Sequence, residues 1–194
     1  MKIIGITGGV GTGKSKVLSY LQQEYNAYIC EADHVAWDLQ KPGEACYSEI
    51  VSCFGTEILN EDGTINRKYL GQIVFVDVTQ LKKLNEIMHP AVKRAILSLI
   101  EVQRSQGCEM FVIEAALLLE TKYDALCEET WYVYSGEQVR RERLKTSRAY
   151  TEGKIDRIMA AQLSEDYFRE KCDRVIDNDG AFEETCRQIK EILG

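Results

Sequence analysis

Residues 8 to 15 place four glycines, a lysine and a serine in the spacing G-x-x-x-x-G-K-[ST], which cradles the phosphates of a nucleoside triphosphate. The apolar run Ile3 to Ile6 precedes them, and Val17, Leu18 and Leu21 recur on one helical face after them. A strand that feeds a glycine loop and then a helix directs backbone N–H groups at anionic oxygens. These flanks favour a phosphate site over the alternative, a glycine-rich turn with an accidental Lys-Ser.

Each residue type in this loop suits a different part of a polyphosphate. The glycines let the backbone approach the phosphates without a Cβ in the way. Lys14 is a flexible point charge suited to the β- and γ-phosphates. Ser15 supplies a hydroxyl for Mg²⁺, which takes hard oxygen ligands. The expected nucleotide-binding residues are Gly8, Gly9, Val10, Gly11, Thr12, Gly13, Lys14, Ser15 and Lys16.

Composition narrows the classes of protein to consider. The chain has 194 residues, 45% of them hydrophobic, which suits one α/β domain with elaborations. A net charge of −7 argues against a general nucleic-acid or membrane-surface protein. Seven cysteines, none in C-x-x-C spacing, predict neither a disulfide framework nor a zinc site. Because no secretion signal or membrane-length apolar stretch is visible, we expect a cytoplasmic protein, a monomer or small homo-oligomer, acting on a small molecule.

Five short apolar runs predict β-strands that alternate with helical patterns. Such alternation indicates a parallel sheet with helices on both faces, where ligands collect at the carboxyl ends of the strands. The predicted strands are Lys2–Ile6, Ala27–Cys30, Met110–Ile113, Trp131–Tyr134 and Arg174–Ile176. The polar residues that follow them, and that we consider for chemistry, are Thr7, Glu31, Asp33, Glu114, Ser135, Asp177 and Asn178.

Almost eighty residues separate Cys30 from Met110, far more than a plain crossover between neighbouring strands needs. Their pattern is helical. It predicts a helix ended by Gly55, a turn at Asp62-Gly63 and a break at His89-Pro90. We expect an inserted helical subdomain that covers a substrate.

Two acidic residues at strand ends carry alternative interpretations. Asp33 suits a general base for an acceptor hydroxyl or a ligand of Mg²⁺-bound water, and equally suits a helix N-cap. Glu114 suits a group that orients Mg²⁺ through water, and equally a carboxylate that pairs with a nearby cation.

Two ring side chains also carry alternative interpretations. For Trp37, we favour packing in the core over a role as a stacking platform for a base. His89, before a proline, favours a helix start, with a substrate contact as the alternative.

Seven cations gather between residues 140 and 157 of this acidic chain. They are typical either of a solvated helix, with Glu137, Glu142 and Asp156 as partners, or of a mobile flap whose arginines close over ATP. We favour the flap, with Arg143 and Arg148 neutralising charge in the transition state.

Taken together, the motifs closely resemble those of the dephospho-CoA kinase family, which phosphorylates the ribose 3′-hydroxyl of dephospho-CoA in the last step of coenzyme A synthesis. The resemblance runs along nearly the whole chain in the family's order. Its parts are the segment Ile4 to Ser15, Glu31-Ala32-Asp33, Pro42-Gly43, Phe54-Gly55, Asp62-Gly63, Arg67 with Leu70, Ile73-Val74-Phe75, His89-Pro90, Glu114 to Glu120, Gln138, Arg157, Gln162 and Ile176-Asp177-Asn178.

The resemblance implies a three-layer α/β P-loop NTPase fold, with a five-stranded parallel sheet, an inserted helical substrate domain and a helical lid. It implies a nucleotide-binding core over residues 1–33 and 106–194, a CoA-binding insertion over 34–105 and a lid over 137–165. It implies ATP as donor with Mg²⁺ at Ser15 and Glu114, Asp33 as base, and Lys14, Arg143 and Arg148 as catalytic cations. Implied nucleotide and substrate contacts are Asn178 near the adenine, and Thr7, Asp33, His89, Leu117, Glu120 and Arg157 for the acceptor.

The chain departs from the family pattern at a few positions. Lys16 replaces a usual threonine, Glu31 and Glu114 stand where aspartate is common, and Ala116 stands where proline is common. A one-residue shift in the lid leaves Arg141 and Arg143 as alternatives for the first lid arginine, whereas Arg148 fits the second.

Two other functions compete with this interpretation. A nucleoside monophosphate kinase would share the machinery and differ in acceptor. A regulatory GTP switch is disfavoured because no Asn-Lys-x-Asp guanine-reading motif occurs.

Overall fold

The structure is a computed structural model that describes residues 1–194. The chain divides into two compact units. The sheet unit comprises residues 1–30 and 103–194, and the helical unit comprises residues 31–102.

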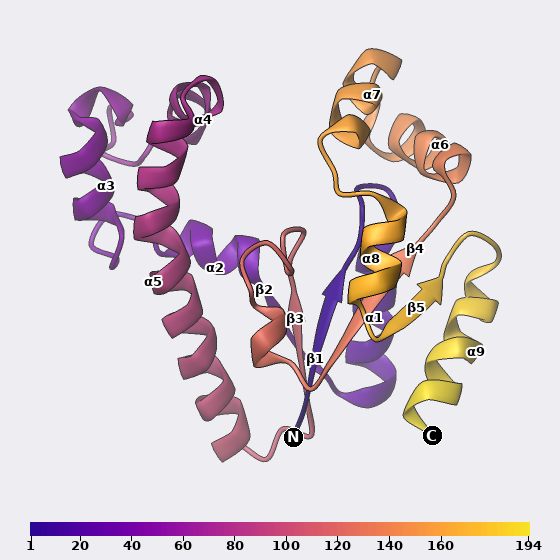
Figure 1. Cartoon of the computed structure of the whole chain (residues 1–194). Helices are drawn as coiled ribbons and strands as arrows, with labels where there is room; N and C mark the ends of the chain where they lie inside the picture. Colours follow the sequence, from indigo (N-terminus) through magenta and orange to yellow (C-terminus); the bar gives the residue numbers. More distant parts are fainter. The chain divides into compact units, whose positions relative to one another are not determined.

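A five-stranded sheet organises the sheet unit, in the order β2-β3-β1-β4-β5 (Figure 1). Its strands are β1 (Lys2–Thr7), β2 (Tyr28–Glu31), β3 (Met110–Glu114), β4 (Glu129–Tyr134) and β5 (Arg174–Asp177). The pairings of β1 with β3, β1 with β4, and β4 with β5 are parallel. All five predicted strands are confirmed, and the predicted α/β fold class with them. Residues that follow different strands therefore gather at the carboxyl ends of the strands.

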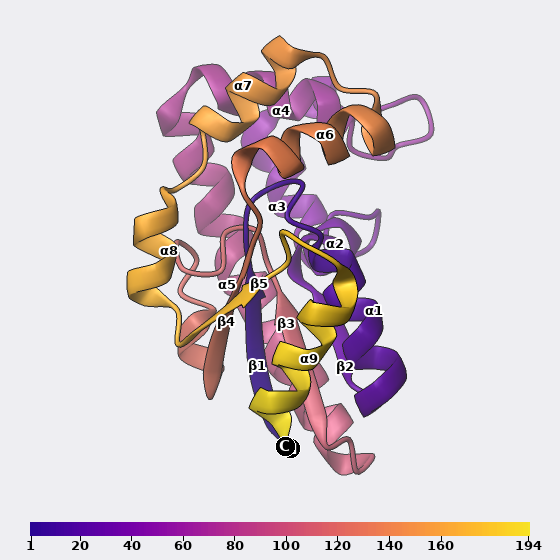
Figure 2. The ribbon, with the colours of Figure 1, turned by 90° about the vertical axis from the view of Figure 1, so that its right-hand side faces the viewer.

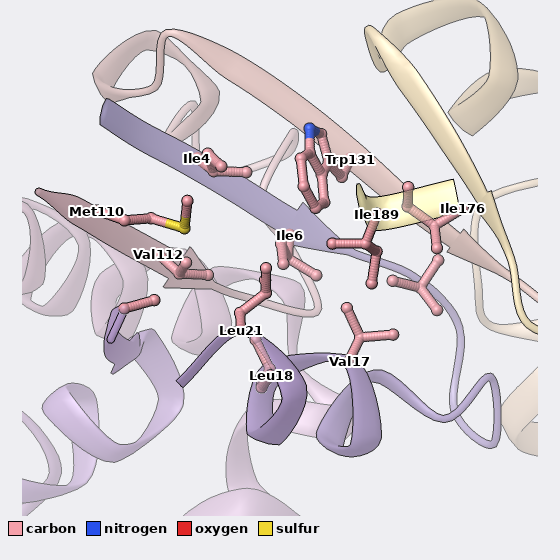
Figure 3. Close-up of a cluster of buried hydrophobic side chains, with 12 residues drawn as sticks. Ile4, Ile6, Val17, Leu18, Leu21, Met110, Val112, Trp131, Ile176 and Ile189 are labelled. Carbon is pink, nitrogen blue, oxygen red and sulfur yellow. The ribbon is translucent and has the colours of Figure 1, made fainter. Parts of the chain in front are cut away.

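Alternation along β4 shows how the layers form. Trp131 and Val133 lie on the face covered by α1 (Lys14–Tyr25) and α9 (Phe182–Leu193), where they join a buried apolar cluster. Figure 3 shows Trp131 within this cluster. Tyr132 points to the other face and stacks on Phe168 of α8 (Glu165–Lys171), with ring centroids 4.8 Å apart. Each fully buried apolar side chain contributes roughly 1.5–3 kcal/mol. The sheet is therefore a rigid support for the loops at its edge.

The predicted lid segment holds two consecutive helices, α6 (Glu137–Arg148) and α7 (Glu152–Ala160), both labelled in Figure 2. Arg141 of α6 pairs with Glu137 on its own helix and with Glu152 and Asp156 on α7. Exposed pairs of this kind are individually weak. One further short helix of the sheet unit, η2, spans Asp124–Leu126.

Apart from Glu31, the last residue of β2, the helical unit contains no residue of the main sheet. Its helices are α2 (Ala32–Asp38), α3 (Tyr47–Phe54), η1 (Thr56–Ile58), α4 (Arg67–Val76) and the long α5 (Val78–Ser105), which runs on to the sheet unit (Figure 1). Gly55 ends α3 with a φ of +84°, as predicted. The predicted turn at Asp62-Gly63 is also confirmed, because the Thr64 amide donates to Oδ1 of Asp62 at 3.0 Å.

The predicted break at His89-Pro90 is wrong, because Pro90 lies inside the 28-residue helix α5. An interior proline removes one backbone hydrogen bond and costs about 3 kcal/mol. Apolar residues buried on both sides of it, Met88 before and Val92 and Ile96 after, hold the helix together across this point. His89 is consequently a mid-helix residue and does not begin a helix.

Candidate active site

The glycine loop joins the end of β1 at Thr7 to the start of α1 at Lys14. The N-cap residue of α1 is Gly13, and no side chain caps this end of the helix. The first-turn N–H groups and the positive end of the helix dipole therefore offer a site for an anion. In the sheet register Ile6 pairs with Glu114, so the end of β3 lies alongside the start of the loop.

Two loop positions require glycine for reasons that the structure shows directly. Gly8 has a φ of +151°, and a Cβ there would lie 2.5 Å from the carbonyl oxygen of Val133. Gly13 has a φ of +87°, and a Cβ there would collide with the side-chain amide nitrogen of Asn178. The loop backbone is thus shaped by neighbours from β4 and from the residue after β5, as well as by its own sequence.

The side chain of Lys14 folds back over its own loop. Its Nζ donates to the carbonyl oxygen of Gly8 at 2.7 Å and lies 3.7 Å from Oε1 of Glu114. Both side chains are largely buried, at 14% and 12% exposure. Of the two interpretations of Glu114 from sequence, pairing with a cation is confirmed, and that cation belongs to the phosphate loop itself.

Two arginines on one face of α6 hold carbonyl groups of the loop. Arg140 Nε donates to the carbonyl oxygen of Val10 at 3.0 Å, and Arg143 Nη1 donates to that of Thr12 at 3.2 Å. Burial lowers the pKa of the Arg140 guanidinium below its ordinary value, but an arginine remains charged at neutral pH. The Arg140 guanidinium also contacts Oε1 of Gln162, two residues after the end of α7. These contacts join the predicted lid to the loop.

The other predicted cations of the cluster do not reach the loop. Arg141 forms the surface ion pairs described above, which raise its pKa, so the solvated-helix interpretation holds for this residue. Arg148 is exposed at the end of α6, where its hydrogen bond lowers the pKa of Tyr150. Arg157 is exposed on α7 and donates to the carbonyl oxygen of Gly153 at 3.1 Å. Of the two alternatives for the first lid arginine, Arg143 is the one at the loop.

Asn178, predicted near the adenine, has its side chain committed elsewhere. It is buried, and its Nδ2 donates to the carbonyl oxygen of Thr12 at 2.7 Å. Ser135 Oγ donates to the backbone carbonyl of Asn178, also at 2.7 Å. The residue therefore lies beside the loop, and a contact with adenine stays a prediction.

The remaining predicted residues of the sheet unit occupy varied positions. Thr7 is buried at the end of β1, with its hydroxyl 3.5 Å from the carbonyl oxygen of Ala116. Leu117 and Glu120 are exposed in the turn after β3. Ser15 and Lys16 are exposed in the first turn of α1, where Lys16 lies over the ring of Phe182. Ser15 is thus accessible to a metal held by bound phosphates.

In the helical unit, Asp33 is exposed in the first turn of α2. The N-cap of α2 is Glu31, so the N-cap interpretation of Asp33 is wrong. The prediction that Trp37 packs in the core is wrong, because this side chain is 41% exposed. Cζ of the Arg67 guanidinium lies 4.0 Å from the centroid of the Trp37 ring. His89 is half-buried in α5, and burial lowers its pKa.

Sequence reasoning missed Arg140 and Thr185 as residues of this site. Arg140 belonged to the recognised cation cluster, and its spacing of three from Arg143 indicates a shared helix face, which is the signal that would have identified it. Thr185, a buried residue of α9 that contacts Asn178, has no such signal because its neighbours are ordinary helix residues.

No cluster of three or more His, Cys, Asp or Glu side chains is arranged to hold a metal ion. A metal at Ser15 and Glu114 would accordingly take most of its ligands from phosphate and water, as Mg²⁺ commonly does. No helix combines the length and the apolar character needed to cross a membrane.

Comparison with known proteins identifies the family. A family model described as dephospho-CoA kinase matches residues 2–184. The dephospho-CoA kinase of Carboxydothermus hydrogenoformans is 38% identical over 193 residues, covering 100% of this chain and 93% of the relative. That of Shouchella clausii is 35% identical over 190 residues, covering 98% and 96%.

Solved structures share the fold along the whole chain. The Thermus thermophilus protein TT1252 superposes with a TM-score of 0.86 at 26% identity, covering 99% of this chain and 96% of the other. The dephospho-CoA kinase of Campylobacter jejuni superposes with a TM-score of 0.70 at 22% identity, covering 99% and 98%. With the glycine loop, its lysine and the α6 arginines in place, these matches lead to one conclusion: the chain belongs to the dephospho-CoA kinase family.

Proposed function

We propose that the protein transfers the γ-phosphoryl group of ATP to the ribose 3′-hydroxyl of dephospho-CoA, giving coenzyme A and ADP. The observation that carries the proposal is the loop itself, an uncapped helix start with Lys14 and two α6 arginines gathered on it. Phosphoryl transfer needs positioning and charge neutralisation above all, and this loop supplies both. Family membership supplies the acceptor.

On the donor side, backbone N–H groups of the loop and the ammonium of Lys14 bind the β- and γ-phosphates. The hydroxyl of Ser15 and the carboxylate of Glu114 suit Mg²⁺, directly or through water, because both are hard oxygen donors. Held there, Mg²⁺ would neutralise negative charge on the β- and γ-phosphates. Arg143 and Arg148 are the lid cations of residues 137–165, and Asn178 is a nucleotide contact.

On the acceptor side, Asp33 takes the proton of the 3′-hydroxyl as its oxygen bonds to the γ-phosphorus. The bond between that phosphorus and the β–γ bridging oxygen breaks, and ADP leaves. Exposure of Asp33, free of a capping role, supports this assignment. Residues 34–105 form the CoA-binding part, with Thr7, His89, Leu117, Glu120 and Arg157 as acceptor contacts.

Cytoplasm is the proposed compartment, because none of the seven cysteines forms a disulfide in the structure, as expected in a reducing environment. We propose a monomer or small homo-oligomer that binds neither nucleic acid nor membrane.

An acceptor comparison tests the function. We expect ATP- and Mg²⁺-dependent ADP release with dephospho-CoA and negligible release with AMP or CMP, with 3′-phosphorylation confirmed by mass spectrometry. Lys14→Ala should abolish the activity, since the loop then lacks its phosphate cation. Turnover of AMP or CMP in place of dephospho-CoA would identify a nucleoside monophosphate kinase. Tight GTP binding without transfer to any acceptor would identify a regulatory switch.

A further inference from the structure

The carbonyl oxygen of Thr12 accepts hydrogen bonds from two side chains, Asn178 through Nδ2 at 2.7 Å and Arg143 through Nη1 at 3.2 Å. Oγ of Ser135 lies 3.2 Å from the same oxygen. In a planar trans peptide the C=O and the following N–H point in opposite directions. The two donors, Asn178 and Arg143, therefore fix the direction of the Gly13 N–H, which faces away from them.

The amide orientation of Asn178 follows from these partners. The Thr12 oxygen can only accept, so the group facing it is the amide NH₂. Oδ1 of Asn178 then faces Oγ1 of Thr185, 3.0 Å away, and this hydroxyl hydrogen is shared with the carbonyl of Asp177, also at 3.0 Å. Thr185 and Asn178 are buried, so water cannot replace a hydrogen-bond partner that either of them loses.

Ser135 completes the arrangement from the end of β4. Its hydroxyl accepts from Arg143 Nη1 at 2.9 Å and donates to the Asn178 carbonyl at 2.7 Å. It is 2% exposed. The two donors to the Thr12 carbonyl, Asn178 and Arg143, are thus held in place by the buried residues Thr185 and Ser135, neither of which belongs to the loop.

We propose that Thr185 and Ser135 are positioning residues for the phosphates of the nucleotide. They act through Asn178 and Arg143, which orient the Thr12–Gly13 peptide so that its N–H faces the bound phosphate. The inference rests on the proposed function only in taking the loop as the ATP-phosphate site. It also gives Asn178 a role that differs from contact with adenine.

The test uses tripolyphosphate, which has the phosphates of ATP and no adenine. Its affinity and that of ADP are measured by calorimetry on the full chain, well below the melting temperature. Thr185→Val removes the hydroxyl at constant shape, and Thr185→Ser keeps it. The matched control is Thr130→Val near the start of β4, at the end of the strands opposite to the phosphate loop. There another buried threonine hydroxyl donates to Asp173 Oδ2 at 2.7 Å.

We expect Thr185→Val to weaken tripolyphosphate and ADP by the same factor, about 5- to 10-fold, as loss of a buried hydrogen bond predicts. The KM of Thr185→Val for ATP should rise by the same factor, with kcat little changed. Thr185→Ser should restore the affinities and the KM to the wild-type values. Thr130→Val should lower only the melting temperature. Unchanged tripolyphosphate affinity in Thr185→Val overturns the proposal, as does a loss confined to ADP, which would instead indicate adenine contact.

If Thr185→Val does not fold, Ser135→Ala is measured in the same way with the same two decisive outcomes. Failure of the proposed function is separately visible. A wild-type protein that binds tripolyphosphate but does not phosphorylate dephospho-CoA would refute the acceptor while the positioning result stands.

Discussion

The ammonium of Lys14 lies 3.7 Å from Oε1 of Glu114, so the cation of the phosphate loop is paired with the carboxylate that ends β3. A buried pair of this kind leaves an uncompensated charge when one partner is removed. The two side chains therefore act as a unit, and changing either alters the other.

Glu114→Gln should lower kcat/KM for ATP by about 10- to 100-fold, because it releases Lys14 and removes a carboxylate suited to Mg²⁺. Steady-state kinetics at several Mg²⁺ concentrations measure this, and the Mg²⁺ requirement should rise as well. Glu129→Gln is the matched control, since Glu129 is equally buried but pairs with Lys2 and Arg174 at the far edge of the sheet. Equal losses in the two variants would contradict a role in the site.

Arg140→Ala should reduce kcat/KM for ATP by about 10-fold or more, because the Val10 carbonyl loses its buried, charged donor. Arg141→Ala, at the next residue of the same helix, should change kcat/KM for ATP by less than about 3-fold, because the Arg141 side chain makes only surface ion pairs. Side-by-side kinetics decide the matter. A larger loss in the Arg141 variant would reverse the assignment of these two arginines.

Asp33→Asn should lower kcat by about 10²-fold or more with ATP affinity nearly unchanged, as expected for a positioned general base. The measurements are kcat with dephospho-CoA and the Kd of ATP. Asp38→Asn provides the control on the same helix, where the carboxylate pairs with Lys41 at 2.6 Å. Collapse of ATP affinity in Asp33→Asn would show that Asp33 acts on the metal or the structure.

Stability should depend on Glu129 in the acid range. Burial alone would raise the pKa of this carboxyl, but hydrogen bonds from Arg174 and Lys2 outweigh it and hold the pKa below its ordinary 4.5. A lowered folded-state pKa means stability that is present above pH 4.5 and is lost as pH falls through the folded value. Urea unfolding should show wild type more stable than Glu129→Gln at pH 7, with the difference shrinking below about pH 4.5. A difference that stays constant with pH would contradict the linkage.

Local sequence signals predicted the elements of the sheet unit well, because each strand is a short apolar run and the glycine loop needs a particular strand and helix around it. The end of α3 at Gly55 and the turn at Asp62-Gly63 were predicted equally well, because a positive φ or a turn closed by a side chain depends on only one or two residues. Pro90 was misleading. A local rule predicts a break there, whereas burial of apolar residues on both sides preserves the helix.

The partners of the loop were harder to predict than the loop itself. Nothing near Asn178 in the sequence indicates that its amide lies against Gly13, and nothing near Thr185 indicates that it faces Asn178. Such contacts depend on three-dimensional packing between distant elements. The exposure of Trp37 has the same origin, because stacking with Arg67 depends on the path of the intervening chain.

The contact between Asn178 and Thr12 spans 166 positions of the chain. The phosphate loop is synthesised before β5 and α9, so its conformation is completed only after those two elements have been made. Contacts of such long sequence separation are slow to form and belong to the late stages of folding. A ribosome-bound chain that stops before residue 178 would hold the whole glycine motif and still lack the Asn178 donor, so nucleotide binding would depend on the synthesis of β5 and the residue that follows it.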